Sequence, residues 1–537
     1  LEGYDGTVED GDMFFLSDPY SVAGAISHSN DWLVLLPVFR NGRLLGYTAM
    51  FGHQSDIGGK VAGSMPIDAS SIFEESGRIP PVKLVLPRSG KPAWCAADLN
   101  ALVASCRVAA RRLQEMCDRF GEDVYVSATQ ELLARNYRAM EQLISTSIGE
   151  EPVSFEDFIC DDGKGFGPYR IRCTMYKKDG KVILDFDGTD PQSEASINFY
   201  LNENMLKMFF GIYMIMVFDP QILFNDGFYE LIDVRIPQGS LLKPNFPAAL
   251  SGRTHALGRI FDILGGLLGQ KTPEFLNAAG FSSSPHLFYS GVDGEGRWFQ
   301  LFQIGFGGIP GRPLGDGPDG HSLWPGFTNV PNEFLERYFP LVIERYETAP
   351  DSGGAGLHRG GNGIHMTSRF LEPGVIAIHD DRWFTYPWGV NGGAPGARAR
   401  KILERSDGTS TVIGNKVENL HVEAGDLLHF ITWGGGGWGD PLQRDPGLVA
   451  KEISQGLVTR DGALAYGVVA GCDGVVDVPA TAGLRERMQA ARSGPLPTFN
   501  YGADVETLRA RCLEETGLPA PRQPVWTRKS GRLVAAE

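Results

Sequence analysis

The dipeptide Asn41-Gly42 lies between two apolar runs, residues 32–39 and 43–51. Asn-Gly flanked by such runs is the strongest short-range signal for a two-residue β-hairpin turn. We therefore expect the two runs to pair as antiparallel strands. This hairpin constrains the fold more than any other feature, because its register decides which residues meet at its open end.

The open end of the hairpin carries one short pattern twice, a His followed three residues later by an Asp. The two copies are His28 with Asp31 and His53 with Asp56. A tight turn would place Asp31 opposite Gly52 and bring both copies together, since paired strands lie only about 5 Å apart. A single copy is typical of surface hydrogen bonding, but the hairpin predicts that the two copies converge.

The converging side chains form a mixed set of metal ligands, with two imidazoles, two carboxylates and no thiolate. Such a set suits Mn²⁺, Fe²⁺ or Zn²⁺ better than Ca²⁺ or Mg²⁺. Two neighbouring carboxylates would repel each other without a cation, and a metal ion removes that cost. We therefore expect His28, Asp31, His53 and Asp56 to bind one divalent metal ion.

The rest of the sequence predicts an α+β protein with a large, loop-rich mixed β architecture, an inserted helical hairpin and a helical C-terminal tail. Residues 1–96 are expected to be β-rich and to hold the metal site, and residues 97–150 to form the helical hairpin. Residues 151–440 would form an α+β core with Gly-rich loops. Residues 441–537 would be a tail that makes subunit contacts.

Individual helices are predicted from apolar residues at three- and four-residue spacing. The hairpin helices are expected over residues 97–120 and 125–148, and a further helix over residues 202–217. Polar helices are expected in the tail over residues 448–455 and 484–491.

Composition excludes several classes of partner. The chain has 537 residues and a formal net charge of −16, and no cluster of Lys or Arg could follow a nucleic-acid backbone. The apolar stretch of residues 205–218 is too short to cross a bilayer. Seven cysteines without a C-x-x-C spacing indicate reduced thiols. We expect a cytoplasmic protein that binds neither nucleic acid nor a membrane.

Longer motifs are distributed through nearly the whole chain. They include Asp18-Pro19-Tyr20, His53-Gln54-Ser55-Asp56-Ile57-Gly58-Gly59, Arg78-Ile79-Pro80-Pro81, Ser251-Gly252-Arg253-Thr254-His255, Pro350-Asp351-Ser352-Gly353-Gly354 and Gly434-Gly435-Gly436-Gly437-Trp438-Gly439-Asp440-Pro441. On these motifs the chain resembles the hydantoinase B family, which includes subunits of acetone and acetophenone carboxylase, 5-oxoprolinase and caprolactamase. In carboxylase-like relatives the two His/Asp patterns ligate a metal, and both patterns are complete here.

The resemblance implies a division of labour between subunits. A separate hydantoinase A-type subunit would bind ATP and phosphorylate the substrate or bicarbonate, with or without a small accessory subunit, and this chain would perform the next step. In agreement, the sequence has no G-x-x-x-x-G-K-[ST] loop. The glycines of residues 434–439 lack the following Lys, and we expect them to form a tight turn.

Two reactions fit this division. In the first, which we expect, the chain is the catalytic subunit of an ATP-dependent carboxylase, a ligase that joins a phosphoenol-activated ketone to CO₂ from carboxyphosphate. Gln54 resembles the carboxylases of the family more than the hydantoinases. In the second, the chain belongs to an ATP-dependent amidohydrolase of the hydantoinase, oxoprolinase or lactamase type, which opens a phosphorylated cyclic amide with metal-activated water. A non-enzymatic scaffold is a third possibility.

Five further residues are candidate catalytic groups. Arg253 and His255 precede a predicted helix, where an Arg could bind a phosphate or carboxylate. A structural ion pair is the alternative for Arg253. Asp316, Asp319 and His321 could act as acid or base, although Gly-Asp-Gly-Pro is also ordinary turn chemistry.

Overall fold

The computed structural model describes residues 2–84, 94–273, 276–280, 283–321, 327–471, 474–529 and 532–535. The chain forms two compact units. Unit 1 comprises Leu1–Glu151, Met175–Asp185 and Gln192–Arg253, and unit 2 comprises Pro152–Thr174, Phe186–Pro191 and Thr254–Glu537. Of the segments expected from the sequence, 1–96 and 97–150 fall in unit 1, 151–440 is divided, and 441–537 falls in unit 2.

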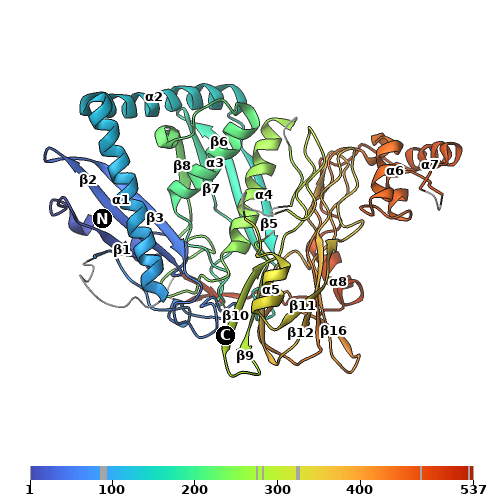
Figure 1. Cartoon of the computed structure of the whole chain (residues 1–537). Helices are drawn as coiled ribbons and strands as arrows, with labels where there is room; N and C mark the ends of the chain where they lie inside the picture. Colours follow the sequence, from blue (N-terminus) through green and yellow to red (C-terminus); the bar gives the residue numbers. More distant parts are fainter. Residues whose placement is uncertain are drawn as a thin grey trace. The chain divides into compact units, whose positions relative to one another are not determined.

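Unit 1 contains a four-stranded antiparallel sheet in the order β3-β2-β1-β4. Its strands are β1 (Phe14–Leu16), β2 (Asp31–Arg40), β3 (Arg43–His53) and β4 (Val82–Lys83). The long helix α1 (Trp94–Phe120) lies along this sheet (Figure 1). Leu102, Val103 and Cys106 of α1 share a buried apolar cluster with Val34 of β2, so one face of the hairpin is covered.

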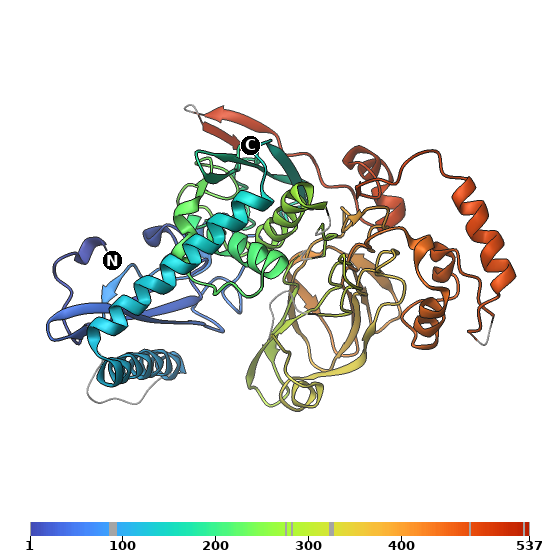
Figure 2. The ribbon, with the colours of Figure 1, turned by 90° about the horizontal axis from the view of Figure 1, so that it is seen from above.

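The predicted helical hairpin is confirmed. Helix α2 (Glu122–Ser147) follows α1 after the single residue Gly121. In Figure 2, α2 lies in the plane of view while α1 is seen nearly end-on, so the chain turns sharply between them. The helix predicted over residues 202–217 is α3 (Glu203–Phe218), and the Asn202 side chain caps its first amides. Unit 1 also contains the parallel pair β7 (Lys181–Asp185) and β8 (Ile232–Arg235).

The β2–β3 hairpin forms as predicted, but its expected register is wrong by one residue. Asn41 and Gly42 both have positive φ, 51° and 78°, as a type I′ turn requires. A β-bulge beyond the turn leaves Leu45 without a partner on β2. The pairing is therefore shifted, and Asp31 lies opposite His53 rather than Gly52.

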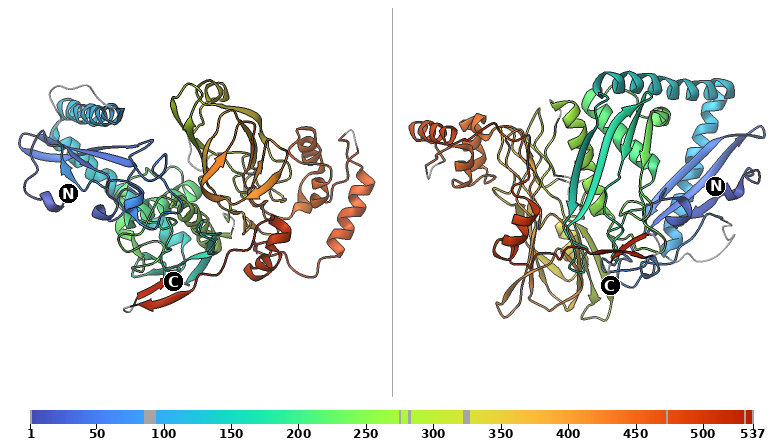
Figure 3. Two further views of the ribbon diagram at one scale, coloured as in Figure 1. Left: turned by 90° about the horizontal axis from the view of Figure 1, so that it is seen from below. Right: turned by 180° about the vertical axis from the view of Figure 1, so that it is seen from behind.

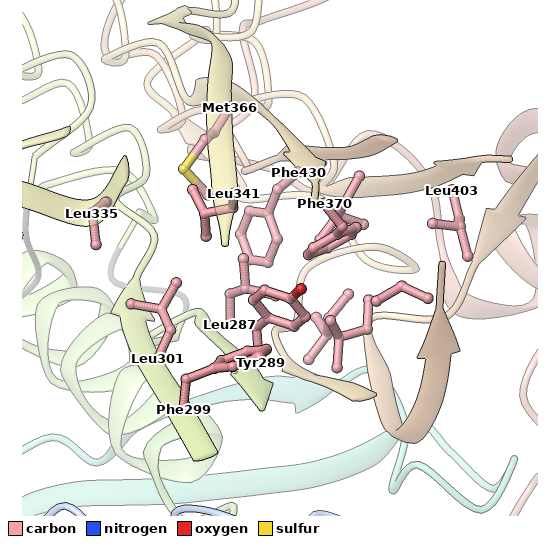
Figure 4. Packing of buried hydrophobic residues seen from close by; sticks show 14 of the residues in the cluster. Leu287, Tyr289, Phe299, Leu301, Leu335, Leu341, Met366, Phe370, Leu403 and Phe430 are labelled. Atoms are coloured by element: carbon pink, nitrogen blue, oxygen red, sulfur yellow. The ribbon is translucent and has the colours of Figure 1, made fainter. Parts of the chain in front are cut away.

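Unit 2 is built around two antiparallel sheets. The first has the order β10-β9-β13-β17, with β9 (His286–Val292), β10 (Trp298–Ile304), β13 (Gly374–His379) and β17 (Lys416–Val422). The second has the order β11-β12-β18-β15-β16, with β11 (Leu341–Thr348), β12 (Ile364–Phe370), β15 (Arg400–Glu404), β16 (Ser410–Ile413) and β18 (Leu427–Ile431). Their apolar faces share one core, in which the ring centroids of Tyr289 and Phe370 lie 4.7 Å apart (Figure 4).

Helices and short strands complete unit 2. Those before the tail are β5 (Val153–Ile159), α4 (Thr254–Lys271), α5 (Asn332–Tyr338) and β14 (Gly389–Val390). The boundary between the units divides β6 (Tyr169–Lys178). The tail contains α6 (Pro446–Ser454), α7 (Val478–Ala490), β19 (Phe499–Asn500), α8 (Val505–Thr516), β20 (Trp526–Lys529) and β21 (Arg532–Ala535). Both views of Figure 3 show α6 and α7, in orange, beside the sheets of this unit.

The glycines of residues 434–439 do not form the expected tight turn. Their backbone runs through the centre of the Gly-rich loops, and successive amides donate to carbonyls of different loop residues. Gly434 donates to Ala397, Gly435 to Gly361, Gly436 to Ala279, Gly437 to Ala394 and Gly439 to Val390. A Cβ at Gly434 would lie 1.7 Å from a backbone oxygen, so only glycine permits this packing.

The structure can also be compared with the expectations about membrane-spanning segments and thiols. No helix in the described ranges is both long and apolar enough to cross a membrane. Five cysteines are buried free thiols, namely Cys106, Cys117, Cys160, Cys173 and Cys512. Cys472 lies outside the described residues.

Candidate metal centre

Three predicted ligands meet at the open end of the β2–β3 hairpin. Asp31 and His53 are directly opposite on the two strands, and Oδ1 of Asp31 lies 3.4 Å from Nδ1 of His53. His28, in the loop before β2, places Nε2 3.0 Å from Nδ1 of His53. Its Nδ1 lies 2.8 Å from Oδ2 of Asp31. One ligand atom from each of the three residues lies within 4.8 Å of the others.

The loop that carries His28 is held by close backbone contacts within unit 1. Gly24 has φ 74°, and a Cβ at this position would lie 2.2 Å from the carbonyl oxygen of Tyr200, so the loop requires glycine there. The side-chain amide of Asn30 donates to the carbonyls of Gln54 and Gly63. These contacts tie the loop before β2 to the loop after β3, which fixes the two histidines relative to each other.

Arg253, distant in sequence, completes the immediate surroundings of the three ligands. Its Nη2 lies 3.1 Å from Nε2 of His28, and its Nε donates to Oγ of Ser27 over 2.7 Å. Ser27 in turn lies 3.3 Å from Oδ2 of Asp31. No carboxylate in the described part of the chain forms a salt bridge with Arg253, so its buried guanidinium has no directly paired negative charge.

The electrostatics of the centre favour metal-binding forms of both residue types. Burial, with a smaller effect from the charge of Arg253, lowers the pKa of His28 to about 3, so this imidazole is neutral at neutral pH. Burial opposes ionisation of Asp31, but His28, His53 and Arg253 outweigh it and hold the pKa of Asp31 well below its usual range. A neutral imidazole and an ionised carboxylate are the ligating forms.

The donor set fits a divalent transition metal. Two nitrogens 3.0 Å apart can both reach one cation at the usual ligand distance of about 2.1 Å. The side chain of His28 is 3% exposed and that of His53 is 38% exposed, so the group is buried on one side and open to solvent on the other. This openness leaves room for a substrate.

Asp56, the fourth predicted ligand, lies outside the three-residue group. Its Oδ1 accepts from the amide of Gly58 and from Oγ of Ser64, at 2.8 and 2.7 Å, and its Oδ2 accepts from the amide of Gly63 at 2.9 Å. These bonds close the loop that follows β3. The assignment of Asp56 as a metal ligand stays a prediction.

Glu75, which the sequence reasoning missed, organises the segment before Arg253. Its Oε1 accepts from the backbone amides of Leu250 and Ser251, and burial raises the pKa of Glu75 to about 7. Ser27 was missed as well, although its position directly before His28 is a usable signal. Nothing in the local sequence around Glu75 reveals its role, because the contact spans 175 residues.

The other predicted catalytic residues lie in unit 2. His255 is buried within the first turn of α4, and burial lowers its pKa well below the usual value. Asp316 accepts hydrogen bonds from both terminal nitrogens of Arg444. Asp319 likewise accepts hydrogen bonds from both terminal nitrogens of Arg359. Both aspartates thus form bidentate ion pairs.

His321, the last of these candidates, is exposed. Its backbone amide donates to the carbonyl of Gly307. The catalytic roles of His255, Asp316, Asp319 and His321 stay predictions.

Comparisons with known proteins identify relatives over most of the chain. The model of the hydantoinase B/oxoprolinase family matches residues 1–441. The caprolactamase subunit beta of Pseudomonas jessenii is 29% identical over 513 residues, which cover 88% of this chain and 85% of that protein. The acetophenone carboxylase delta subunit of Aromatoleum aromaticum is 25% identical over 528 residues, which cover 86% and 75%.

A solved structure shows the same fold. The crystal structure of ATP-dependent caprolactamase from Pseudomonas jessenii matches with a TM-score of 0.79 and 26% identity. The match covers 90% of this chain and 87% of that chain. The mixed α+β architecture expected from the sequence is therefore confirmed.

Proposed function

The chain belongs to the hydantoinase B/oxoprolinase family, and from this premise we propose that it is the metal-binding subunit of an ATP-dependent enzyme that hydrolyses a cyclic amide. The observation that carries the proposal is the convergence of His28, Asp31 and His53 beside the guanidinium of Arg253. Relatives are named as subunits of multi-subunit enzymes. Partner subunits are therefore part of the proposal.

The three ligands would hold a Mn²⁺, Fe²⁺ or Zn²⁺ ion at the open end of the hairpin. Such an ion supplies Lewis acidity at a carbonyl or phosphoryl oxygen. The protein's own contribution is rigid positioning, because Asp31 and His53 project from paired strands and His28 from a loop fixed by Gly24. Ligands fixed in this way require little reorganisation during reaction.

Arg253 would bind the anionic group of an activated substrate. Its Nη2 lies 3.1 Å from His28, so a phosphoryl oxygen or an oxyanion held by this Arg would lie next to the metal ligands. Arg binds such groups through parallel N–H donors. Glu75, which fixes the backbone at Leu250 and Ser251, would act as a positioning residue for Arg253.

We assign ATP to a hydantoinase A-type partner subunit. The chain has no P-loop sequence, and the glycines that could cradle a phosphate, Gly434–Gly437, already donate their amides to backbone carbonyls. A phosphate cradle needs free amides. Phosphorylation of the amide oxygen on the partner would then give an activated substrate on which this chain acts.

Hydrolysis is preferred over carboxylation because a solved structure that matches this chain, at a TM-score of 0.79 and 26% identity, is that of an ATP-dependent caprolactamase. The caprolactamase subunit beta is also more similar in sequence, at 29% identity, than the acetophenone carboxylase delta subunit, at 25%. Ketone carboxylation of the acetone or acetophenone type is the second candidate. Gln54 within Gly52-His53-Gln54-Ser55-Asp56 favours it, as does the similarity to an acetophenone carboxylase subunit.

The decisive experiment uses the complex assembled with its partner subunits and ATP. A panel of hydantoin, 5-oxoproline and caprolactam is assayed for amino-acid release, and acetone and acetophenone are assayed for fixation of labelled bicarbonate. Ring opening without fixation is expected. Fixation on a ketone would replace the proposal by the second candidate. A complex without stoichiometric metal, in which His53→Ala keeps full activity, would instead identify a scaffold.

A further inference from the structure

Unit 2 contains a surface cavity that the proposed reaction does not use. Its volume is about 310 Å³, within the range of pockets that hold small molecules. It is lined by residues from β5, β6, α4 and the segment around β19, namely Phe155, Glu156, Arg172, Gln270, Phe499 and Tyr501. Ser154 also lines it. All of these residues belong to unit 2.

Three aromatic rings form one wall of the cavity. The ring centroid of Phe499 lies 4.9 Å from that of Phe155 and 6.3 Å from that of Tyr501, with the latter pair stacked at 28°. Behind them, buried Trp388 lies 5.1 Å from Phe155 and 5.5 Å from Phe499. Because Phe155 also packs against Gly266 of α4, the wall is rigid and preformed, which lowers the entropic cost of binding.

Two of the three rings of the aromatic wall remain partly exposed in the folded chain. Tyr501 is 43% exposed and Phe499 is partly buried, whereas Phe155 is buried behind them. A planar ring inserted beside them would gain offset-stacked or edge-to-face contacts in addition to burial of apolar area. An aromatic ligand is therefore favoured over an aliphatic one of equal size.

Arg172 supplies the charge at the cavity. Its stem lies against Gly188, where a Cβ would be 3.2 Å from its Cδ. Within the described part of unit 2, Arg172 forms no salt bridge, and its hydrogen bonds are those of its backbone with Thr189. A partly buried guanidinium without an anionic partner is suited to bidentate binding of a carboxylate.

Glu156 is the opposing charge in the same cavity. It lies 3.9 Å from Nη1 of Arg170, a neighbour two residues before Arg172 on β6. Arg170 therefore offsets the charge of Glu156, and Arg172 is the cation left for a ligand.

We propose that this cavity binds a planar aromatic carboxylate, with its ring against Phe499 and Tyr501 and its carboxylate on Arg172. The site is independent of the metal centre, since it shares none of its residues. It would serve as a second ligand site on the subunit.

The test measures binding of four probes to the full-length chain by isothermal titration calorimetry and saturation-transfer NMR. Benzoate has both the ring and the carboxylate, acetate lacks the ring, cyclohexanecarboxylate lacks planarity, and benzylamine reverses the charge. Benzoate is expected to bind at least about tenfold more tightly than acetate and benzylamine, and several-fold more tightly than cyclohexanecarboxylate. Equal or tighter binding of benzylamine would overturn the proposal in favour of a cation site at Glu156.

Variants test whether benzoate binds at Arg172 rather than at another arginine of the chain. Arg172→Gln is expected to weaken benzoate binding at least about tenfold, and Tyr501→Leu several-fold. The control Arg297→Gln removes an exposed charge of unit 2 that pairs with Asp293 away from the cavity, and is expected to change affinity less than about twofold. His53→Ala should leave benzoate binding unchanged.

Thermal unfolding of all four variants is followed by circular dichroism. Binding is compared only among variants whose thermal stability equals that of the unaltered chain. Loss of benzoate binding in Arg297→Gln or His53→Ala, with no loss in Arg172→Gln, would overturn the proposal. Absence of saturable benzoate binding to the unaltered chain would overturn it as well.

Discussion

Nε2 of His28 lies 3.0 Å from Nδ1 of His53, and the two imidazole rings stack at 27° with centroids 4.9 Å apart. The two residues are 25 positions apart in the chain, and the hairpin between them accounts for their meeting. Asp31 bridges them at 2.8 and 3.4 Å. A carboxylate between two imidazoles is a common arrangement of metal ligands.

Replacing His53 tests the metal centre directly. His53→Ala should reduce the metal affinity of the isolated chain by at least about tenfold. Loss of a residue that only hydrogen-bonds to a metal ligand already lowers metal affinity roughly 10–100-fold. Metal content after dialysis is measured by inductively coupled plasma mass spectrometry. His429→Ala is the matched control, because His429 and His365 also lie 3.3 Å apart without belonging to a three-ligand group in the described residues. Equal metal loss in both variants would contradict a specific centre.

Asp56 distinguishes a loop-closing role from a ligand role. The carboxylate of Asp56 now accepts hydrogen bonds from Gly58, Gly63 and Ser64. In Asp56→Asn, the side-chain NH₂ group would replace one of the accepting oxygens and would face a donor instead. The lost hydrogen bonds should cost about 1–3 kcal/mol of unfolding free energy, with metal affinity changed less than in His53→Ala. Denaturant unfolding and metal titration are measured on the same preparation. Loss of metal with unchanged stability would instead support the ligand assignment made from the sequence.

Glu75 predicts a pH dependence of stability. Burial raises its pKa to about 7, above the ordinary value near 4.5, so the folded chain retains this proton over a range in which the unfolded chain has released it. The contribution of Glu75 to the free energy of unfolding is fully present below about pH 4.5, falls as the pH rises to about 7, and then levels off. The total loss in the free energy of unfolding is roughly 3 kcal/mol. Glu75→Gln should remove this part of the slope in unfolding measured from pH 4.5 to 8. An unchanged slope in the variant would refute the assignment.

Asp381 predicts a large stability effect in unit 2. Its carboxylate lies 2.7 Å from Nη2 of Arg259 and 3.2 Å from Nζ of Lys416, with all three side chains fully buried. Asp381→Asn leaves two buried cations without their shared anion, and should cost about 3–5 kcal/mol. Asp293→Asn, which breaks an exposed pair with Arg297, is the control and should shift the denaturation midpoint far less. Similar shifts in the two variants would contradict the buried-pair argument.

Local patterns made the helices and the hairpin predictable. Helices α1 and α2 lie at residues 94–120 and 122–147, close to the ranges expected from helical spacing, because each buries one apolar stripe. The turn at Asn41-Gly42 was predictable because both residues tolerate positive φ. Helix α8 was missed, since its exposed, polar sequence carries only a weak apolar stripe.

Long-range packing made the remainder unpredictable. The contact of Arg253 with His28 spans 225 residues, and no periodicity reports such a distance. The run Gly434–Gly439 has the composition of a turn, yet its backbone passes between several loops, which becomes evident only when those loops are in place. The bulge at Leu45 belongs to the same class, because nothing in the apolar pattern of β3 marks an unpaired residue.

The bulge gives the most direct test of how the hairpin builds the metal centre. Because Leu45 has no partner on β2, its deletion should leave a regular hairpin in which Asp31 still faces His53, and metal affinity should stay within about threefold of the unaltered chain. Insertion of one Ala between Thr48 and Ala49 has the opposite consequence. It moves His53 one position past Asp31 and turns one of the two side chains to the other face of the sheet, so metal affinity should fall at least about tenfold. Both variants are compared by metal titration, with circular dichroism to verify folding. If the deletion abolished binding while the insertion preserved it, the register of β2 and β3 would not be what brings the ligands together.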